Sequence, residues 1–174
     1  MSLKELTAEK HQLAESTPFM KAVFARTLPK ETWIDWTYQK ALFYNVIEAQ
    51  CRIAGYLDDL PGIERTHLLM KDYREMIGNG TMNNSFRSPT IGYYRYILSL
   101  DSKAVLAHLY TWHMGDMFGG QAIKKIVDAP HSSLEFDNPM LLMTNLRNKP
   151  SDDLGPEANT AFDWAIKIMS SYNV

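Results

Sequence analysis

The sequence is poor in cysteine, in excess charge and in long apolar stretches, and each shortage excludes a class of protein. Cys51 is the one cysteine in 174 residues, so an internal disulfide and a metal cluster built from cysteine alone are excluded. We expect Cys51 to be a small apolar residue on a buried helix face. A formal net charge of −2 gives no overall attraction to nucleic acid or to an anionic membrane, and we expect neither as a partner.

No stretch of the chain approaches the run of about 20 apolar residues that crosses a bilayer. The sequence begins MSLKELTAEKHQ, which is polar and charged, unlike a secretory signal peptide. We therefore expect a cytoplasmic protein with no membrane association. The chain is long enough to bury a core without disulfides, and we expect one domain over residues 1–174 that works as a monomer.

Helical periodicity dominates the sequence, and no stretch alternates apolar and polar residues convincingly for a strand. Ser2 and Glu5 form a capping-box pattern, Thr17 precedes Pro18, and Asp101 precedes a long amphipathic segment; each marks a helix start. Further helices are predicted over about residues 31–56, 65–77, 89–100, 101–127, 138–148 and 156–171, with the clearest loop at residues 78–89. The predicted fold class is all-α.

The segment HLYTWHMGDMFGGQAIKK, residues 108–125, places three glycines inside a predicted helix. Each costs roughly 0.5–1 kcal/mol relative to alanine, which indicates that something comes close to the backbone. Gly115 and Gly119 lie one turn apart on one face, with Gly120 beside them, and the bare backbone forms a flat groove. Such a groove admits either another helix or a flat ligand. Asp116 beside it would be expensive to bury without partners or ordered water.

The same segment strongly resembles the distal-helix signature of the heme oxygenases. The matching residues are Ala107, His108, Tyr110, Thr111, Gly115, Asp116, Gly119, Gly120, Gln121, Lys124 and Lys125. LKELTAEKHQLAESTPFMKAV resembles the family's proximal helix and the start of the next, and EANTAFDWAIKIM resembles its last helix. The resemblance covers nearly the whole chain. It implies a helical bundle with heme sandwiched between a proximal and a distal helix.

The resemblance also implies an enzyme that opens heme to biliverdin, carbon monoxide and ferrous iron, using O2 and electrons. Heme is then both cofactor and substrate. The family's iron ligand falls on His11, and Glu15 one turn on can hydrogen-bond the ring nitrogen that does not bind iron. Gly115 and Gly119 would leave room for bound oxygen. Asp116 would order the water that delivers protons.

Other residues are implied to bind the heme itself. Lys4, Tyr110 and Arg147 are the candidates for holding its propionates. Gly120 belongs to the groove, and Phe162 matches an aromatic residue of the last helix that lines the pocket.

Three residues depart from the family pattern. Trp112 stands where the family has arginine, which removes a positive charge from the distal side. Phe118 stands in place of serine and adds bulk beside the groove. His113 replaces a tyrosine, and its role is open. The family carries a histidine at the position of His108 without using it on iron.

Nothing in the sequence can store electrons, because it has no cysteine cluster, glycine-rich dinucleotide turn or flavin signature. Electrons must come from a partner such as a ferredoxin or a flavoprotein reductase. Lys21, Lys124 and Lys125 are candidates for its docking face, although a charge cluster is usually a solvated surface.

Two other function classes stay open. One is a non-catalytic heme carrier or sensor, which the intact Gly–Asp–Gly–Gly set argues against, because storage needs no proton relay. The other is a related non-heme helical scaffold that binds thiamine precursors or two metals, for which the chain lacks an ExxH motif.

Overall fold

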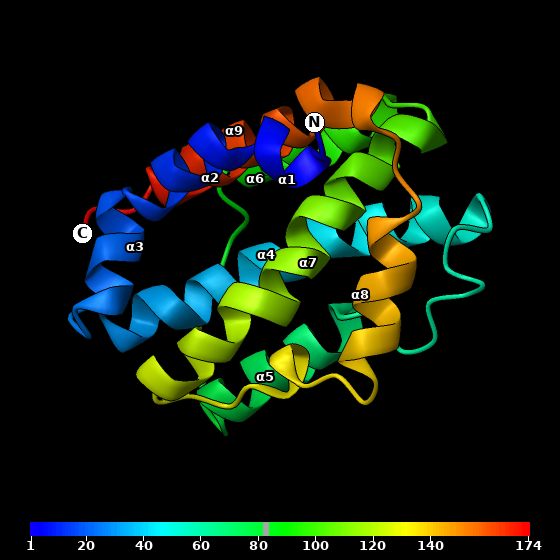
Figure 1. The fold of residues 1–174 in the computed structure, drawn as a ribbon. Helices are drawn as coiled ribbons and strands as arrows, with labels where there is room; N and C mark the ends of the chain where they lie inside the picture. Colours follow the sequence, from blue (N-terminus) through cyan, green and yellow to red (C-terminus); the bar gives the residue numbers. More distant parts are fainter. Residues whose placement is uncertain (82–83) are drawn as a thin grey trace.

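The computed structural model describes residues 1–81 and 84–174, and every regular element in these two ranges is helical (Figure 1). The α-helices are α1 (Leu3–Leu6), α2 (Ala8–Glu15), α3 (Pro18–Phe24), α4 (Lys30–Ile53), α5 (Thr66–Ile77), α6 (Ser88–Ser99), α7 (Ser102–Ile126), α8 (Pro139–Arg147) and α9 (Gly155–Met169), and the 3-10 helices are η1 (Ser132–Leu134) and η2 (Asp152–Leu154). The all-α prediction is confirmed. Over the same ranges, no helix is both long and apolar enough to cross a membrane.

The helix starts predicted from local motifs are present. Ser2 and Glu5 form the complete capping box, in which each side chain accepts the backbone amide of the other residue. Thr17 accepts a backbone amide at 3.3 Å at the start of α3, and Asp101 accepts one at 2.8 Å at the start of α7. These caps use only neighbours in the sequence, which is why the sequence predicts them well.

Helix ends differ from the predictions by a few residues. α4 ends at Ile53 instead of near residue 56, because Gly55 just beyond it takes φ +78°, a left-handed conformation that glycine adopts without strain. α6 begins at Ser88, since Pro89 is tolerated in a first helical turn, where its missing amide has no partner to lose. Of the predicted loop at residues 78–89, residues 82 and 83 lie outside the described ranges.

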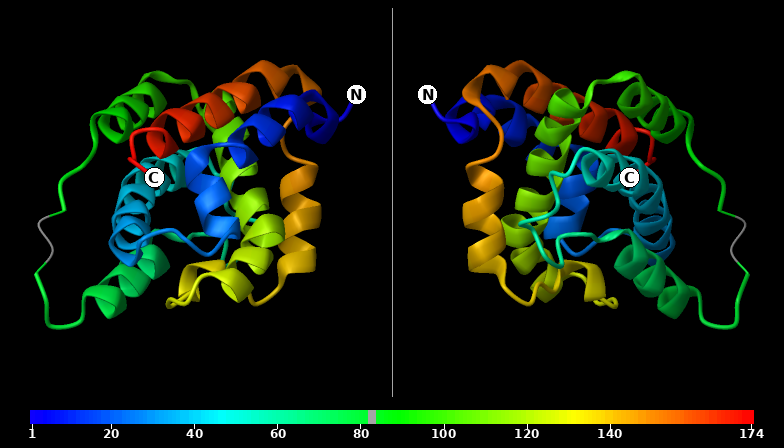
Figure 2. Two further views of the ribbon diagram at one scale, coloured as in Figure 1. Left: turned by 90° about the vertical axis from the view of Figure 1, so that its left-hand side faces the viewer. Right: turned by 90° about the vertical axis from the view of Figure 1, so that its right-hand side faces the viewer.

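The two longest helices, α4 and α7, pack against each other at the centre of the molecule, and the other helices surround them (Figure 1, Figure 2). Phe43 and Ile47 of α4 and Leu109 of α7 are fully buried between them. Cys51 near the end of α4 is fully buried too, which confirms the prediction for this residue. α5 packs against α4, and α9 packs against α7.

α1 and α3 contact α7 near its two ends. Leu3 of α1 packs with Ala107 near the start of α7. α3 packs against α7, with Val23 and Val127 lining one hollow at its far end. α2, which links α1 to α3, packs on α9; in Figure 1 α2 and α3 are blue, and α7 is the yellow-green helix that runs diagonally through the centre. The middle of α7, which carries the glycines, therefore lies between the two contacts.

A buried carboxylate holds the segment that follows α7. Asp72 on α5 is 1% exposed and accepts the amides of Ser132 and Ser133 at 2.8 and 2.9 Å. It also accepts the Ser133 hydroxyl at 2.7 Å. Leu134, the next residue of η1, lies against α7, so Asp72 ties α5, η1 and α7 together.

Asp72→Ala is expected to lower the free energy of unfolding by about 1–3 kcal/mol, because buried donors lose their acceptor. Urea denaturation followed by circular dichroism measures the change. Asp163→Ala is the matched control, since Asp163 forms a half-exposed ion pair with Lys10 at 2.6 Å; it should change stability by about 0–1 kcal/mol. Equal effects of the two substitutions would contradict the role given to Asp72.

Candidate active site

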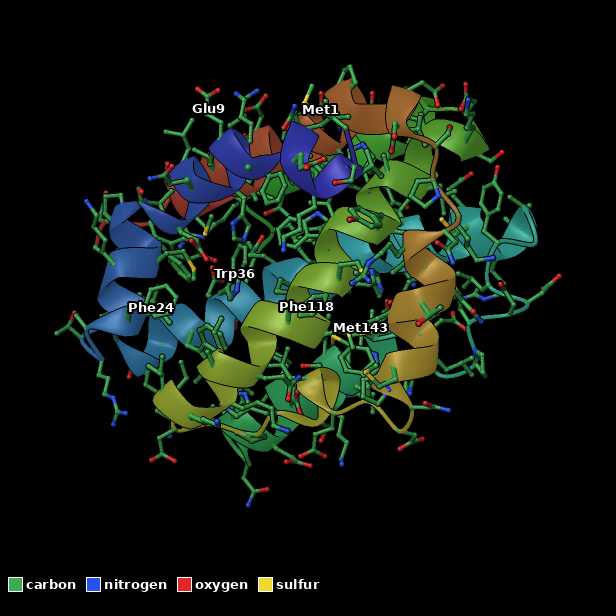
Figure 3. The ribbon with its side chains drawn as sticks, in the orientation of Figure 1. Met1, Glu9, Phe24, Trp36, Phe118 and Met143 are labelled. Carbon is green, nitrogen blue, oxygen red and sulfur yellow. The ribbon has the colours of Figure 1, made fainter. Side chains whose placement is uncertain are left out.

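The exposed face of α7 carries two glycines with open space in front of them. Gly115 and Gly119 are both exposed, and a Cβ atom on either would meet no heavy atom within 4 Å. Phe118 beside them is 54% exposed, and Figure 3 labels it on the side of α7 turned toward the viewer. We call the backbone of residues 115–119 on this face the glycine strip. It provides the room that a flat ligand would need.

Gly120 lies on a different face of α7. It is buried, and a Cβ atom there would lie 2.8 Å from Leu134 Cδ2. Successive residues of a helix are turned by about 100° around its axis, so Gly120 points toward η1 while Gly119 points outward. The predicted three-glycine groove is a strip of two glycines. Gly120 serves the close packing of η1 on α7, and its position gives no support to the predicted contact with heme.

Asp116 lies at the edge of the glycine strip and is bound by two side chains of α4. Its side chain is 10% exposed, and one carboxylate oxygen lies 3.1 Å from Lys40 Nζ. The other oxygen accepts the Tyr44 hydroxyl at 2.7 Å. Burial and the Asp116 carboxylate raise the pKa of Tyr44 well above its usual value, so the hydroxyl keeps its proton and donates. The prediction that this carboxylate needs partners is confirmed.

Neither Lys40 nor Tyr44 is predicted from the sequence. The two stand one turn apart on α4, which is a common arrangement on a long helix, and only the packing of α4 on α7 brings them to Asp116. Trp112 carries no charge, but Lys40 of α4 brings a positive charge to this side of the site.

A second polar contact supports Tyr44. His113 Nε2 lies 2.9 Å from a carboxylate oxygen of Glu48, and the His113 ring stacks on Tyr44 with 4.8 Å between centroids. Both His113 and Glu48 are buried. Burial alone would raise the pKa of Glu48, but hydrogen bonds from His113 and from the backbone of Arg65 hold it below its usual value. His113, whose role the sequence leaves open, thus helps to hold the Tyr44 ring in place.

His11 lies on α2, next to the last helix. Its side chain is 56% exposed, and its ring meets the ring of Phe162 on α9 edge-on, with 5.6 Å between centroids. His11 Nε2 lies 3.6 Å from a Glu15 carboxylate oxygen, which is too long for a hydrogen bond. The structure therefore brings His11, Glu15 and Phe162 together, but it does not show the predicted hydrogen bond between the first two.

The predicted propionate residues lie on three helices, Lys4 on α1, Tyr110 on α7 and Arg147 on α8. Tyr110 packs against the cluster that contains Leu3 of α1, and Lys4 is the next residue of α1. Burial raises the pKa of Tyr110, while the charge of Arg147 on α8 opposes that rise. Lys4 and Arg147 are exposed. The two cations and the hydroxyl are thus carried by three different helices, α1, α8 and α7.

Two hollows of about 420 and 280 Å³ lie elsewhere on the described surface. The larger one is lined by the α3–α4 connection and the end of α7, including Trp33. The smaller one lies between α7 and α8, where Met117 and Met143 face it. Neither is lined by His11, Gly115 or Gly119. Over residues 1–81 and 84–174, no three His, Cys, Asp or Glu side chains are grouped to hold a metal ion.

The sequence matches a model of the family described as heme oxygenase over residues 1–138. Mouse heme oxygenase 2 is 25% identical over 97% of this chain and 63% of its own length. Heme oxygenase 2 from Synechocystis is 26% identical over 70% of this chain and 52% of its own length. The chain thus spans less than two thirds of the length of these curated relatives.

Two solved structures share the fold. Heme oxygenase-1 from Synechocystis, in complex with heme, superposes with a TM-score of 0.84 at 22% identity, covering 97% of this chain and 89% of that one. Heme oxygenase from Leptospira interrogans gives 0.84 at 24% identity, covering 99% and 100%. At this level of identity the likeness concerns the fold alone, and it agrees with the all-helical prediction.

Gly119→Ala is expected to raise the free energy of unfolding by about 0.5–1 kcal/mol, because the alanine favours the helix and its methyl group meets open space. Gly120→Ala is the matched control one residue on. Its methyl group would meet Leu134 at 2.8 Å, which offsets the gain. Urea denaturation compares the two variants. Stabilisation by Gly120→Ala but not by Gly119→Ala would show that the two faces are wrongly assigned.

Proposed function

Because the chain belongs to the heme oxygenase family, we propose that it opens heme to biliverdin, carbon monoxide and ferrous iron, with O2 and electrons from a separate donor. The observation that carries the proposal is the Asp116 carboxylate, held by Lys40 and Tyr44 at the edge of the glycine strip. Storage of heme would need the room that the strip offers. It would not need a nearly buried carboxylate fixed beside that room.

The described residues fit a flat apolar ring with a charged edge. The glycine strip offers bare backbone to one face of such a ring, and Phe162 offers an aromatic edge beside His11. Lys4, Tyr110 and Arg147 can hold the propionates, because cations and a hydroxyl bind carboxylates well. Heme itself supplies the iron that binds O2 and the macrocycle that is opened.

His11 is the proposed iron ligand. An imidazole binds a metal in its neutral form, through one nitrogen, while a hydrogen bond from the other nitrogen sets the ring's orientation. Glu15 stands one turn on and 3.6 Å away, so a small rotation of either side chain would make that bond. The exposure of His11 leaves its second nitrogen accessible to a ligand.

Asp116 is the proposed organiser of proton delivery. Each of its oxygens has one protein partner, Lys40 or Tyr44, and keeps a further lone pair for water. Tyr44 and Lys40 fix the carboxylate, so water bound to it lies at the glycine strip. Lys40 is 11% exposed and connects this water to the solvent. Protons can then reach the strip through acid catalysis.

The electrons come from a partner in this proposal, such as a ferredoxin or a flavoprotein reductase. Lys21, Lys124 and Lys125 remain the proposed docking residues. Lys124 and Lys125 lie in the last turn of α7, and Lys21 lies in α3, which packs against α7.

Addition of hemin, followed by ascorbate or a reduced ferredoxin, tests the proposed function. We expect the Soret absorption to disappear while biliverdin absorption rises. A Soret band that persists under both donors would instead identify a carrier or sensor.

His11→Ala is expected to lose the normal ferric heme spectrum and biliverdin formation, because the iron loses its protein ligand. Added imidazole should restore part of both. His67→Ala is the control, since His67 is an exposed histidine on α5. An unchanged spectrum and rate in His11→Ala would remove His11 from the role.

Asp116→Ala is expected to keep heme binding but to lower the yield of biliverdin in a fixed reaction time by at least about a hundredfold, because acid–base catalysis contributes at least that factor to a rate. Asp116→Asn should keep part of the activity, because an amide can still hold water. Asp128→Asn, at an exposed position beyond α7, is the control. Soret titration measures binding, and biliverdin absorption measures yield. An unaltered yield in Asp116→Ala would exclude Asp116 from proton delivery.

A further inference from the structure

A line of tryptophan and tyrosine rings leads from the glycine strip through α6 and α9 to the partly exposed Tyr96. The centroid of Trp112 on α7 lies 6.4 Å from that of Tyr93 on α6. Tyr93 stacks on Trp164 of α9 at 5.4 Å and 17°, and Trp164 lies 5.8 Å from Tyr96. Trp and Tyr are, with Cys, the side chains most readily oxidised by one electron. A continuous line of them can carry an electron by short steps.

One end of the line is at the proposed site. Trp112 precedes Asp116 by one helical turn, so both flank the glycine strip. The Trp112 ring also lies 5.9 Å from the Tyr44 ring, and Tyr44 donates to Asp116. An oxidant in the strip would therefore meet Trp112 as the first member of the line.

Hydrogen bonds give Tyr93 a defined acceptor for its proton. Trp112 Nε1 lies 2.9 Å from the Tyr93 hydroxyl, and an indole nitrogen can only donate. The Tyr93 proton must then point to its other neighbour, His108 Nδ1, at 2.6 Å. Burial lowers the pKa of His108, so its ring is neutral and Nδ1 is free to accept.

A carboxylate at the Nε2 side of His108 can stabilise a positive charge on the ring. His108 Nε2 lies 2.8 Å from a Glu157 carboxylate oxygen, and the hydrogen bond from His108 holds the pKa of Glu157 below its usual value. The carboxylate is therefore ionised. It would stabilise an imidazolium formed at His108. Tyr96 donates to the same oxygen at 2.6 Å, so both tyrosines of the line have a built-in proton acceptor.

The stack of Tyr93 on Trp164 depends on a glycine. A Cβ atom at Gly92 would lie 3.2 Å from two carbons of the Trp164 ring, so Gly92 allows Trp164 to lie close to the α6 backbone. Lys167 Nζ sits 4.6 Å from the Trp164 centroid, and an ammonium there disfavours a positive charge on that ring. An oxidised state would therefore rest on Tyr93 as a neutral radical instead of on Trp164.

We propose that Trp112, Tyr93, Trp164 and Tyr96 form a one-electron conduit that drains oxidising equivalents from the glycine strip. The proposal rests on the proposed function, because a heme site exposed to peroxide can generate a strong one-electron oxidant there. The conduit would spare the side chains around the strip from irreversible oxidation.

One oxidant molecule in the glycine strip takes up one electron. The oxidant in the strip gains one electron from Trp112, which regains it from Tyr93. Tyr93 loses its phenolic proton to His108 Nδ1, so a neutral tyrosyl radical faces an imidazolium paired with Glu157. A soluble one-electron donor such as ascorbate then returns an electron through Tyr96 and Trp164, and the proton moves back to Tyr93.

The test generates the oxidant without heme. Phe118→Cys places a thiol at the glycine strip, and a ruthenium bipyridyl photosensitiser attached there is selective because Cys51 is fully buried. A flash in the presence of a ruthenium(III) ammine quencher transfers an electron to the quencher and leaves an oxidised sensitiser at the strip. Transient absorption and electron paramagnetic resonance then detect a tyrosyl radical. We expect its signal in the labelled protein.

Tyr93→Phe in the labelled protein should reduce the radical yield at least about tenfold, and His108→Gln should slow radical formation by a similar factor because the proton acceptor changes. Tyr94→Phe alters the next residue of α6 and is the matched control, with unchanged yield. Equal yields in Tyr93→Phe and in the control would overturn the conduit.

If Tyr93→Phe fails to fold, Trp112→Phe is the second test, because it keeps an aromatic ring in place while removing the first electron step and the hydrogen bond from Trp112 to Tyr93. Loss of the Tyr93 radical in that variant supports the conduit, and an undiminished radical overturns it. The photochemical result does not depend on heme. A missing radical therefore rejects the conduit, whereas a missing biliverdin product in the unlabelled protein rejects the proposed function.

Discussion

Two carboxylates set the register of α4 against α7, and the proposed site depends on that register. Asp116 projects from α7 and is bound by Lys40 and Tyr44 of α4, while Glu48 projects from α4 and is bound by His113 of α7. Buried ionic contacts contribute little net stability, but leaving one partner unpaired is costly. A shift of one helix along the other would leave both carboxylates without their partners at once. The apolar residues between the helices would tolerate such a shift far better.

The position of the cation has a consequence for the rest of the core. Since Lys40 reaches Asp116 from α4, position 112 of α7 does not have to carry a charge. Trp112 can then pack on Phe43, at 4.7 Å between centroids, and donate to Tyr93. The polar edge of the glycine strip is thus joined to an aromatic core that extends to α6 and α9.

The features that depend on neighbouring residues could be predicted from the sequence. The caps at Ser2, Thr17 and Asp101 are of this kind, and so is the need of Asp116 for partners, which follows from the cost of burying a charge. The identity of those partners could not be predicted, because it depends on how α4 meets α7.

The glycines show where a sequence motif misleads. Adjacent positions in a motif suggest a shared role, yet the surroundings of Gly119 and Gly120 differ. A Cβ atom at Gly119 would meet open space, whereas one at Gly120 would meet Leu134. The spacing of a helix separates them, and only the location of η1 reveals that the second glycine is a packing residue. Conversely, Tyr110 and Arg147 are far apart in the sequence, and the charge of Arg147 acts on Tyr110 because α8 packs against α7.

The burial of Cys51 determines which side chains of this protein would be oxidised first. Burial raises the pKa of its thiol to about 12, with the Glu48 carboxylate adding to the effect. Peroxide reacts with the thiolate, so a thiol held in this protonated state does not enter the sequence of sulfenic, sulfinic and sulfonic acids. It also cannot reach a second chain to form a disulfide-linked dimer. Oxidative ageing of this chain would therefore be visible by mass spectrometry at methionine and aromatic side chains, with its sulfhydryl titre unchanged.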